Sequence, residues 1–495
     1  MSSPAVPAGG AAGARPPLIP IALCALLAGA LAVWQPIVGL GLGAVAVGLT
    51  LIRAVPVRRM APLMVVLIAL AAIAGPNLAA PGLGAAFLFR VLIVLFGLGL
   101  AGYLLLDGRL TMPAGLPRPA AILGVWFLWT ALSIGWAENV LAAVRWTSFM
   151  AMMAGMALAI ALLCRDRRRA KVLLWSLLGA FVVAGLVAVA EVTTGLHLPT
   201  FRSGSEAQYL IGVGSLFGNQ NNFATYLGLC LPYLAVLPLI YRDVRLRAIG
   251  IAGSAASLGF ILLTGSKSGL LSAGFVLAGL VALAAIDPRT RRRLFAALGV
   301  VAVAAVVIIP SLQGGGLIQL DDRTVTKLDF TTLVNQFESG TGSGAVRAGL
   351  LADGLSLVNA TDGLGVGAGN AETRVHELGP VAPRVGNLHN WWLEVLVNGG
   401  LVGFALYLFF YITLIRRQAR ALRTAQDPLV RYMAMAGCIA MIGWIAGSIG
   451  PSTAIHFAPM WIMFGLGMGA LVLARAENRQ SPAPPAPQES APSAS

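Results

Sequence analysis

Long apolar segments follow one another along almost the whole chain, separated by short polar connections. A helix needs about 20 apolar residues to cross the hydrocarbon core of a bilayer, and fourteen segments approach that length. The pattern predicts an all-α polytopic membrane protein with 12–14 transmembrane helices, the lower number applying if segments nine and ten form a re-entrant hairpin. The segments lie at about residues 17–34, 37–55, 62–80, 86–106, 119–136, 146–164, 172–192, 222–241, 248–265, 268–286, 293–310, 391–415, 431–450 and 455–474.

The composition narrows the class of protein further. Hydrophobic residues make up 58% of the chain and charged residues 11%, with a mean hydropathy of +0.84. A soluble domain carries roughly 25% charged residues, so a soluble enzyme, a disordered scaffold and a coiled coil are excluded. The cysteines lie in or beside apolar segments without CxxC spacing, which indicates neither a disulfide framework nor a metal site. They are Cys24, Cys164, Cys230 and Cys438.

One connection between the predicted helices is much longer than the others. Its mixed charge and its spaced apolar residues indicate a folded cap, with a helix expected at 344–358. The Pro/Ala/Ser-rich tails are expected to be disordered, and the first apolar segment is expected to be a retained signal anchor. The predicted organisation is a tail at 1–16, helices one to eleven at 17–310, a large extracytoplasmic loop at 311–390, helices twelve to fourteen at 391–474, and a tail at 475–495.

The basic residues predict how the chain is oriented. The formal net charge is +15, from 34 basic and 19 acidic residues. With the amino terminus inside, 25 of the basic residues fall in cytoplasmic loops and tails and eight in outer loops, and Arg90 lies within segment four. This distribution follows the positive-inside rule and predicts that both termini are cytoplasmic. Aromatic and basic residues are not interleaved in any patch, so no nucleic-acid partner is expected.

Charged residues are missing from the middle of every predicted helix. The exceptions, Arg90, Glu191 and Glu394, lie near predicted outer ends. An ion-coupled transporter is expected to carry an acid or a base near the bilayer midplane. The charge pattern therefore disfavours a transporter.

A surplus of basic residues remains at the predicted outer face. Each one alone is compatible with snorkelling to phospholipid headgroups. Together they predict a cradle for an anionic lipid headgroup such as a pyrophosphate, which Arg binds bidentately. They are Arg90, Arg145, Arg202 and Lys267 near the ends of segments, and Arg347, Arg374 and Arg384 in the long loop.

His389 is the histidine whose position suggests chemistry. It closes the long loop, is followed by Asn390 and directly precedes segment twelve. An imidazole at the membrane surface can take a proton from an incoming hydroxyl or orient that hydroxyl. His197, His376 and His456 lack such a context and are expected to have packing roles. No HExxH or paired-carboxylate spacing is present, so no metal is expected.

Two glycine-containing stretches resemble nucleotide-binding loops only superficially. The sequence GSKSG at 265–269 lacks the order of a phosphate-binding loop, and GLGVGAG at 363–369 follows no strand of a βαβ unit. The second stretch is expected to make a tight turn or to let the backbone approach a ligand closely.

Four stretches in order along the chain resemble the O-antigen ligases and the related O-antigen polymerase-like proteins. His389 and Asn390, followed after nine residues by GLVG at 400–403, fit the family pattern H[NSQ]-x9-GxxG. GNQNN at 218–222 resembles its GN-x-N stretch, and LTGSKSG at 263–269 stands where the family has T-G-S-R-G. Arg347 before GLGVG at 363–367 resembles its loop arginine before a G-x-G-[VP]-G run. The first 200 residues resemble the family only in hydropathy.

The resemblance implies a GT-C-type glycosyltransferase in a bacterial cytoplasmic membrane. Such an enzyme moves a glycan from a polyprenyl-pyrophosphate carrier to an acceptor hydroxyl on a cell-envelope glycan, lipid or protein, at the outer face and without cofactor or metal. It implies that His389 is catalytic and that Lys267 and Arg347 bind pyrophosphate, joined by Arg90, Arg145 or Arg202. Asn219 and Asn390 are candidates for sugar contacts, with helix capping as the alternative for Asn390. The family has arginine at the position of Lys267. Lysine keeps the positive charge but lacks the bidentate guanidinium fork.

Two other functions remain open at this stage. A polymerase that extends the lipid-linked glycan uses the same chemistry as a ligase, and the sequence does not separate them. A flippase or exporter of lipid-linked glycans belongs to a different class. It would need a charged central cavity, which the uncharged helix centres disfavour.

Overall fold

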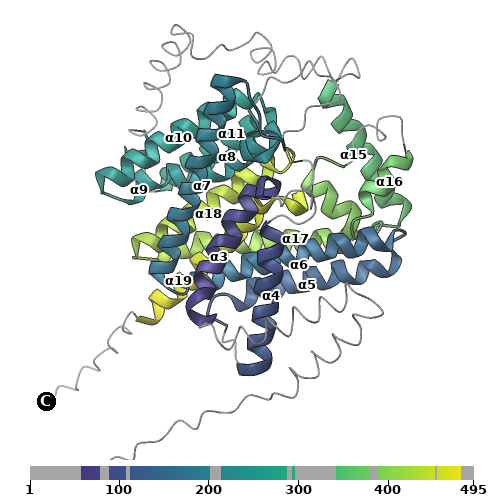
Figure 1. Ribbon diagram of the computed structural model, residues 1–495, viewed down its shortest axis with the longest axis horizontal. Helices are drawn as coiled ribbons and strands as arrows, with labels where there is room; N and C mark the ends of the chain where they lie inside the picture. Colours follow the sequence, from purple (N-terminus) through teal and green to yellow (C-terminus); the bar gives the residue numbers. More distant parts are fainter. Residues whose placement is uncertain are drawn as a thin grey trace, which may run out of the picture. The chain divides into compact units, whose positions relative to one another are not determined.

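The structure is a computed structural model of the chain, and it describes residues 57–78, 88–107, 112–200, 213–286, 292–295, 342–378, 387–451 and 454–480. All regular elements in these ranges are helices, which confirms the all-α prediction (Figure 1). The chain divides into two compact units, residues 1–64 with 92–110 and residues 65–91 with 111–495. All the site residues discussed below belong to the second unit.

Eleven of the fourteen predicted segments correspond to helices of the structure. Within the described ranges, nine helices are long and apolar enough to cross a membrane, and α4 and α11 contain shorter apolar stretches. The segments predicted at 17–34 and 37–55, and nearly all of 293–310, lie outside the described residues. The helices are α3 (Val57–Ala74), α4 (Leu88–Asp107), α5 (Pro117–Leu132), α6 (Val140–Leu163), α7 (Arg167–Thr194), α8 (Gln220–Ala235), α10 (Val244–Thr264), α11 (Lys267–Ile286), α17 (Trp391–Thr424), α18 (Pro428–Gly447) and α19 (Ala458–Gln480).

Some boundaries differ from the prediction. Helix α6 begins six residues earlier than expected, because Asn139 caps it, and Arg145 therefore lies within the helix. The eighth predicted segment is divided into α8 and the short α9 (Leu237–Ile240) after Pro232. Helix α19 continues to Gln480, into the region expected to be a tail.

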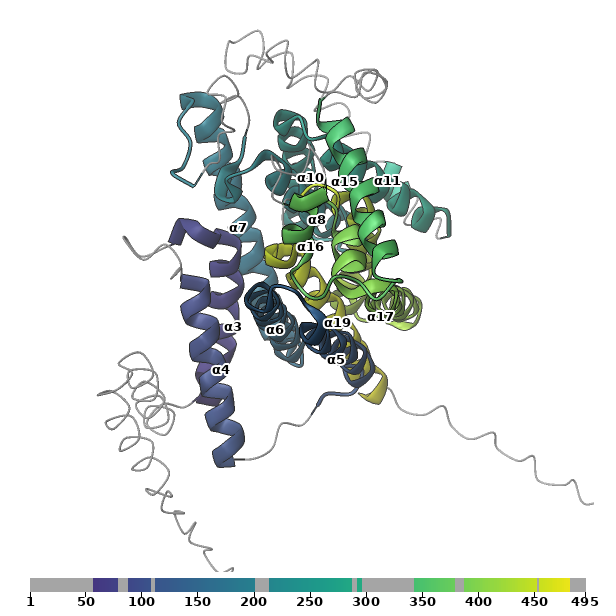
Figure 2. The same ribbon diagram turned by 90° about the vertical axis from the view of Figure 1, so that its right-hand side faces the viewer.

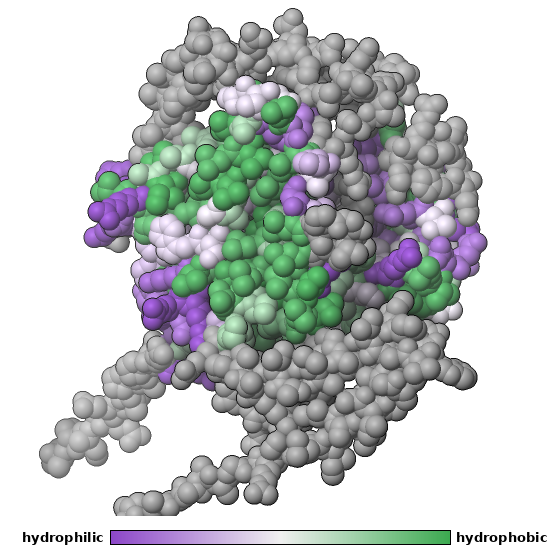
Figure 3. All heavy atoms as spheres, in the orientation of Figure 1, coloured by the Kyte–Doolittle hydropathy of each residue, from purple (hydrophilic) through white to green (hydrophobic). Residues whose placement is uncertain are grey.

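Helices α18 and α19 form the interior of the second unit, and α7 lies at its surface. Most side chains of α18 and α19 are buried, and large aromatic residues pack between them and the neighbouring helices. The Trp126 ring, for example, lies 4.9 Å from the Tyr407 ring and 6.2 Å from the Trp461 ring. Helix α7 exposes apolar side chains such as Leu186, which is 64% exposed. Figure 3 shows a broad hydrophobic area on this face, as expected for helices in contact with lipid.

The described part of the long loop folds against the first turns of α17. It contains α15 (Gly342–Ala360), which confirms the helix predicted at 344–358, and the short α16 (Ala371–Leu378). Leu350 and Leu357 of α15 and Val375 of α16 share a buried apolar cluster with Leu393 and Val397 of α17. Figure 2 shows α15 and α16 beside α17. The loop therefore positions its own side chains over the start of this helix.

A glycine-rich segment locks this cap to a break in α17. Gly400 has φ 65° and ψ −169°, which interrupts the helix. The N–H of Leu401 donates to Gly363 O at 2.8 Å, and the N–H of Val366 donates to Val397 O at 2.9 Å. A Cβ on Gly365 would lie 2.4 Å from the backbone nitrogen of Gly400. Both roles expected for the GLGVGAG stretch are present in part: it makes a tight turn, in which the N–H of Asn370 donates to Gly367 O at 3.2 Å, and its backbone makes a close approach, to α17 instead of a ligand.

Candidate functional site

Three helices begin at one place, around the carboxyl end of α18. The first N–H of α17, on Trp391, donates to Ser448 O at 3.1 Å. At the start of α11, Ser268 Oγ is so close to the end of α18 that a Cβ on Gly450 would lie 2.9 Å from it. Helix α8 joins them through the side chain of Thr225, which donates to Gly447 O at 3.3 Å. This convergence is called the His389 end of the bundle below.

Polar side chains link the starts of α8 and α11. Asn219 caps α8, its Oδ1 accepting from the N–H of Asn221 at 2.8 Å. The Oδ1 of Asn221 accepts a hydrogen bond from Ser266 Oγ at 2.8 Å, and Ser266 Oγ lies 3.1 Å from Ser268 Oγ. Lys267, between these two serines, is the first residue of α11 and is half-buried. The structure therefore holds Asn219 and Lys267 at one hydrogen-bonded corner.

The backbone at His389 has an unusual conformation. Its φ is +47°, in the left-handed region that residues other than glycine seldom adopt, although His, Asn and Asp do so more often than most. Its N–H donates to Asn387 Oδ1 at 3.2 Å. Asn390 follows in an extended conformation and caps α17, its Oδ1 accepting from the N–H of Trp392 at 3.1 Å. The capping role considered for Asn390 is thus present.

The His389 imidazole lies in the electrostatic field of Arg347. Burial and the neighbouring Arg347 guanidinium lower the pKa of His389 from 6.5 to about 4. Burial also lowers the pKa of Arg347. The His389 imidazole is therefore neutral at pH 7, and its buried Nδ1 atom makes no hydrogen bond to the described residues.

Arg90 and His456 form a second group of basic side chains at the His389 end of the bundle, beside that of His389 and Arg347. Its guanidinium carbon lies 4.9 Å above the Phe149 ring, whose centroid is 4.0 Å from that of His456 in an edge-to-face contact. His456 ends the short helix η6 (Ala454–His456), just before α19. Burial and the charge of Arg90 lower the pKa of His456 to about 4. The packing role expected for His456 agrees with these ring contacts.

The other predicted cations have different surroundings. Arg145 is exposed on α6, next to the buried Trp146. Arg374 pairs with Glu138. Arg202 and Arg384 lie outside the described residues. Of the predicted cradle, the structure brings Arg347 to His389 and leaves Arg145 exposed.

Two buried glutamates brace this end of the bundle, and the sequence indicated them only by their positions near helix ends. Glu191 Oε2 accepts the N–H groups of Gly214 and Ser215 at 3.0 and 2.7 Å, and its Oε1 lies 3.2 Å from His197 Nδ1. It thereby holds the segment that leads into α8. Glu394, in the first turn of α17, accepts from the indole N–H of Trp146 at 3.4 Å.

The capping residues differ between the two ends of the bundle. Among the described helices, the side-chain caps at the His389 end are neutral, namely three asparagines and Ser266 at the start of α11, and those at the opposite end are aspartates. A helix N-terminus carries a partial positive charge, which a carboxylate cap offsets and an amide cap does not. The helix starts around His389 therefore keep their attraction for anions. The asparagine caps are Asn139, Asn219 and Asn390 for α6, α8 and α17, and the aspartate caps are Asp166, Asp243 and Asp427 for α7, α10 and α18.

The described side chains include no group of three His, Cys, Asp or Glu residues placed to hold a metal ion. The local arrangement is cationic and hydrogen-bond-donating, which suits an anionic ligand better than a cation. Arg347, Lys267 and the helix starts provide the positive charge, and His389 provides a neutral base.

Comparisons with known proteins agree with the motifs. The sequence profile of a family described as O-antigen ligase matches residues 252–408, a range that includes Lys267, Arg347 and His389. The teichuronic acid biosynthesis protein TuaE of Bacillus subtilis (strain 168) is 24% identical over 407 residues, covering 80% of this chain and 81% of the relative. These matches show that residues 252–408 resemble the O-antigen ligase family and that most of the chain is similar to a teichuronic acid biosynthesis protein.

Proposed function

We propose that the protein transfers a glycan from a polyprenyl-pyrophosphate carrier to an acceptor hydroxyl at the outer face of the cytoplasmic membrane. The observation that carries the proposal is the half-buried, neutral His389 beside Arg347, where α8, α11 and α17 begin. A base and an anion-binding group are the two elements that displacement of a pyrophosphate requires. The teichuronic acid biosynthesis relative supports a cell-envelope polysaccharide as the product.

The cations act on the leaving group. As the bond between the anomeric carbon and the pyrophosphate oxygen breaks, negative charge grows on that oxygen. Arg347 and Lys267 stabilise this charge together with the helix starts, and such fixed groups lower the barrier because they bind the transition state more strongly than the ground state. Arg90 and Arg202 are proposed as additional contacts to the carrier.

His389 acts on the acceptor. Its neutral imidazole takes the proton of the acceptor hydroxyl while the hydroxyl oxygen forms a bond to the anomeric carbon. In-line attack inverts the configuration of that carbon, and the proton remains on the imidazole until the products leave. Asn219 and Asn390 are proposed to contact sugar hydroxyls through their amide N–H₂ groups, because their Oδ1 atoms already accept from the helix starts.

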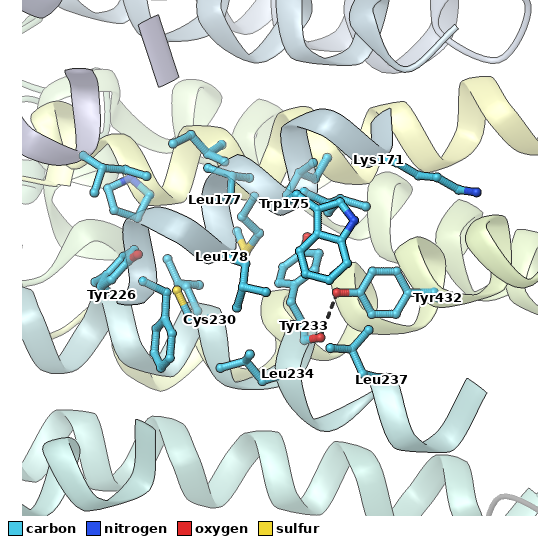
Figure 4. Close-up of a pocket in the computed structure, with 18 of the residues that line it drawn as sticks. Lys171, Trp175, Leu177, Leu178, Tyr226, Cys230, Tyr233, Leu234, Leu237 and Tyr432 are labelled. Carbon is cyan, nitrogen blue, oxygen red and sulfur yellow. Dashed lines mark hydrogen bonds between the residues drawn. The ribbon is translucent and has the colours of Figure 1, made fainter. Parts of the chain in front are cut away.

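An apolar cavity of ≈ 290 Å³ supports a site for the prenyl tail. It lies between α7, α8, α18 and α19, and its lining includes Trp175, Leu178 and Cys230 (Figure 4). Tyr226, in the second turn of α8, also lines it, so one part of the cavity lies close to the proposed pyrophosphate site at the start of that helix. Tyr432 lines another part and donates its hydroxyl hydrogen to Tyr233 O at 2.8 Å.

The test is mass spectrometry of polyprenyl-pyrophosphate glycans in cells whose protein carries His389→Asn. Asparagine tolerates the left-handed backbone at this position, so the variant removes the imidazole with little strain. Accumulated long carrier-linked chains identify a ligase, and accumulated single repeat units identify a polymerase. An unchanged lipid pool in the variant contradicts the transferase proposal and favours an exporter.

The matched control is His197→Gln. His197 contacts Glu191 and lies outside the proposed reacting groups, so transfer is expected to continue in this variant. Both variants are compared at equal amounts of protein in the membrane, which separates lost chemistry from lost expression.

A further inference from the structure

A basic pocket lies at the end of the bundle opposite His389. The cavity measures ≈ 530 Å³ and is formed by the start of α5 and the last turns of α17 and α19. The opposite ends of these helices lie beside the glycine-rich segment for α5, His389 for α17 and His456 for α19, so the pocket lies on the other side of the membrane from the proposed catalytic site. Its polar lining consists of Arg118, Arg417, Arg475, Asn478 and Arg479.

The four arginines have no carboxylate partner among the residues that the structure describes. The nearest acidic residue on α19, Glu477, instead accepts the N–H groups of Gln426 and Asp427 at 2.8 and 2.7 Å. Asp427 pairs with Arg167 of α7 at 2.8 Å. Like charges gathered around one cavity repel one another, and a bound anion relieves this repulsion.

The backbone brings these arginines together at a defined place. Gly115, just before α5, has φ +99°, and a Cβ there would lie 2.6 Å from Leu471 O and 3.0 Å from Arg475 Cγ. The start of α5 therefore packs directly on α19, with Arg118 beside Arg475. Leu116, at the N-cap of α5, makes no side-chain capping bond, so this helix start lacks the aspartate cap of α7, α10 and α18. Its uncompensated dipole adds to the positive charge.

We propose that this pocket binds the phosphate of an anionic phospholipid headgroup in the leaflet opposite the catalytic site. Arginine holds a phosphate bidentately, and basic pockets between transmembrane helices are typical sites for anionic headgroups. The pocket lies at the ends of three membrane-crossing helices, where headgroups are found. Its lining contains no aromatic side chain that would stack on a nucleotide base. A bound lipid would join α5, α17 and α19, and the proposal does not depend on the transferase reaction.

The competing explanation is that the arginines only fix the topology of the chain. Topology responds to the charge of Lys and Arg alike, whereas bidentate phosphate binding requires Arg. The informative variants are therefore R417K/R475K, which keeps the charge, and R118Q/R417Q/R475Q, which removes it. The matched control is R416Q/R423Q, because these arginines lie on the same turns of α17 and do not line the pocket.

The experiment measures the thermal stability of the purified full-length protein as phosphatidylglycerol, phosphatidylcholine or inorganic phosphate is added. Of these three additions, we expect only phosphatidylglycerol to raise the Tm of the wild type and of R416Q/R423Q. Binding should weaken by about fivefold for each arginine removed, so R118Q/R417Q/R475Q should lose nearly all of the Tm shift and R417K/R475K part of it. Equal shifts with phosphatidylcholine, an unchanged shift in both pocket variants, or a full shift with inorganic phosphate would overturn the proposal.

Discussion

The two ends of the helical bundle handle charge in opposite ways. At the His389 end the charged groups near the helix starts are few and partly desolvated, as the lowered pKa values of His389 and Arg347 indicate. At the other end arginines are numerous, and Arg118, Arg475 and Arg479 are exposed. A small number of desolvated charges can interact strongly with a ligand, because little water screens them. A large number of solvated charges mainly fixes the orientation of the chain in the membrane and attracts lipid headgroups.

The helix caps show the same difference. Aspartates cap α7, α10 and α18 at the arginine-rich end, where the surrounding cations offset the charge of a carboxylate. Asparagines cap α6, α8 and α17 at the His389 end. A carboxylate at Asn219 or Asn390 would repel the pyrophosphate of the proposed donor, so the neutral amides cap the helices without opposing the ligand.

The largest expected effect is that of His389→Asn. General-base assistance contributes about 10²–10⁴-fold to a reaction rate, so transfer measured with a purified lipid-linked donor should fall by that factor at unchanged folding. The donor should still bind, because the cations remain. Transfer at the wild-type rate would remove His389 from the mechanism.

Arg347→Gln should have the second largest effect. Loss of one group that stabilises the developing charge costs about 10²–10³ in kcat, and Arg347→Lys should recover part of the activity because it keeps the charge without the fork. The measurement is kcat and KM for the lipid-linked donor. If Arg374→Gln, which breaks the ion pair with Glu138, lowered kcat as much, the special role of Arg347 would be contradicted.

The pH dependence tests the contact between the same two residues. A base must be deprotonated to act, so kcat/KM should fall only as the pH drops towards about 4, the lowered pKa of His389. Removing the charge of Arg347 should raise that pKa towards 6.5, and the acid limb of the profile in Arg347→Gln should move to higher pH. An acid limb near pH 6.5 in the wild type that does not move in the variant would show that the two side chains are not coupled.

The sequence predicted the features that depend on local pattern. Apolar length located eleven of the described helices, and the spacing of leucines located α15. The positions that depend on tertiary packing were not predictable. Nothing local indicates that Ser266 bonds to Asn221, 45 positions away, or that the glycine stretch docks on the break at Gly400. Arg145 was placed in the cradle because it lies near a helix end, but the side of α6 that it occupies is exposed.

The smallest expected effect comes from exchanging the caps. Asn219→Asp and Asn390→Asp keep a side-chain acceptor for the helix N–H groups, so the Tm should remain close to that of the wild type. The new carboxylate would oppose the donor pyrophosphate, and its affinity should fall about five- to tenfold. Asp243→Asn, at the opposite end, makes the converse change far from the donor and should leave its affinity unchanged. Equal affinities in all three variants would show that cap charge serves only the helices, and the contrast between the two ends would then reflect topology alone.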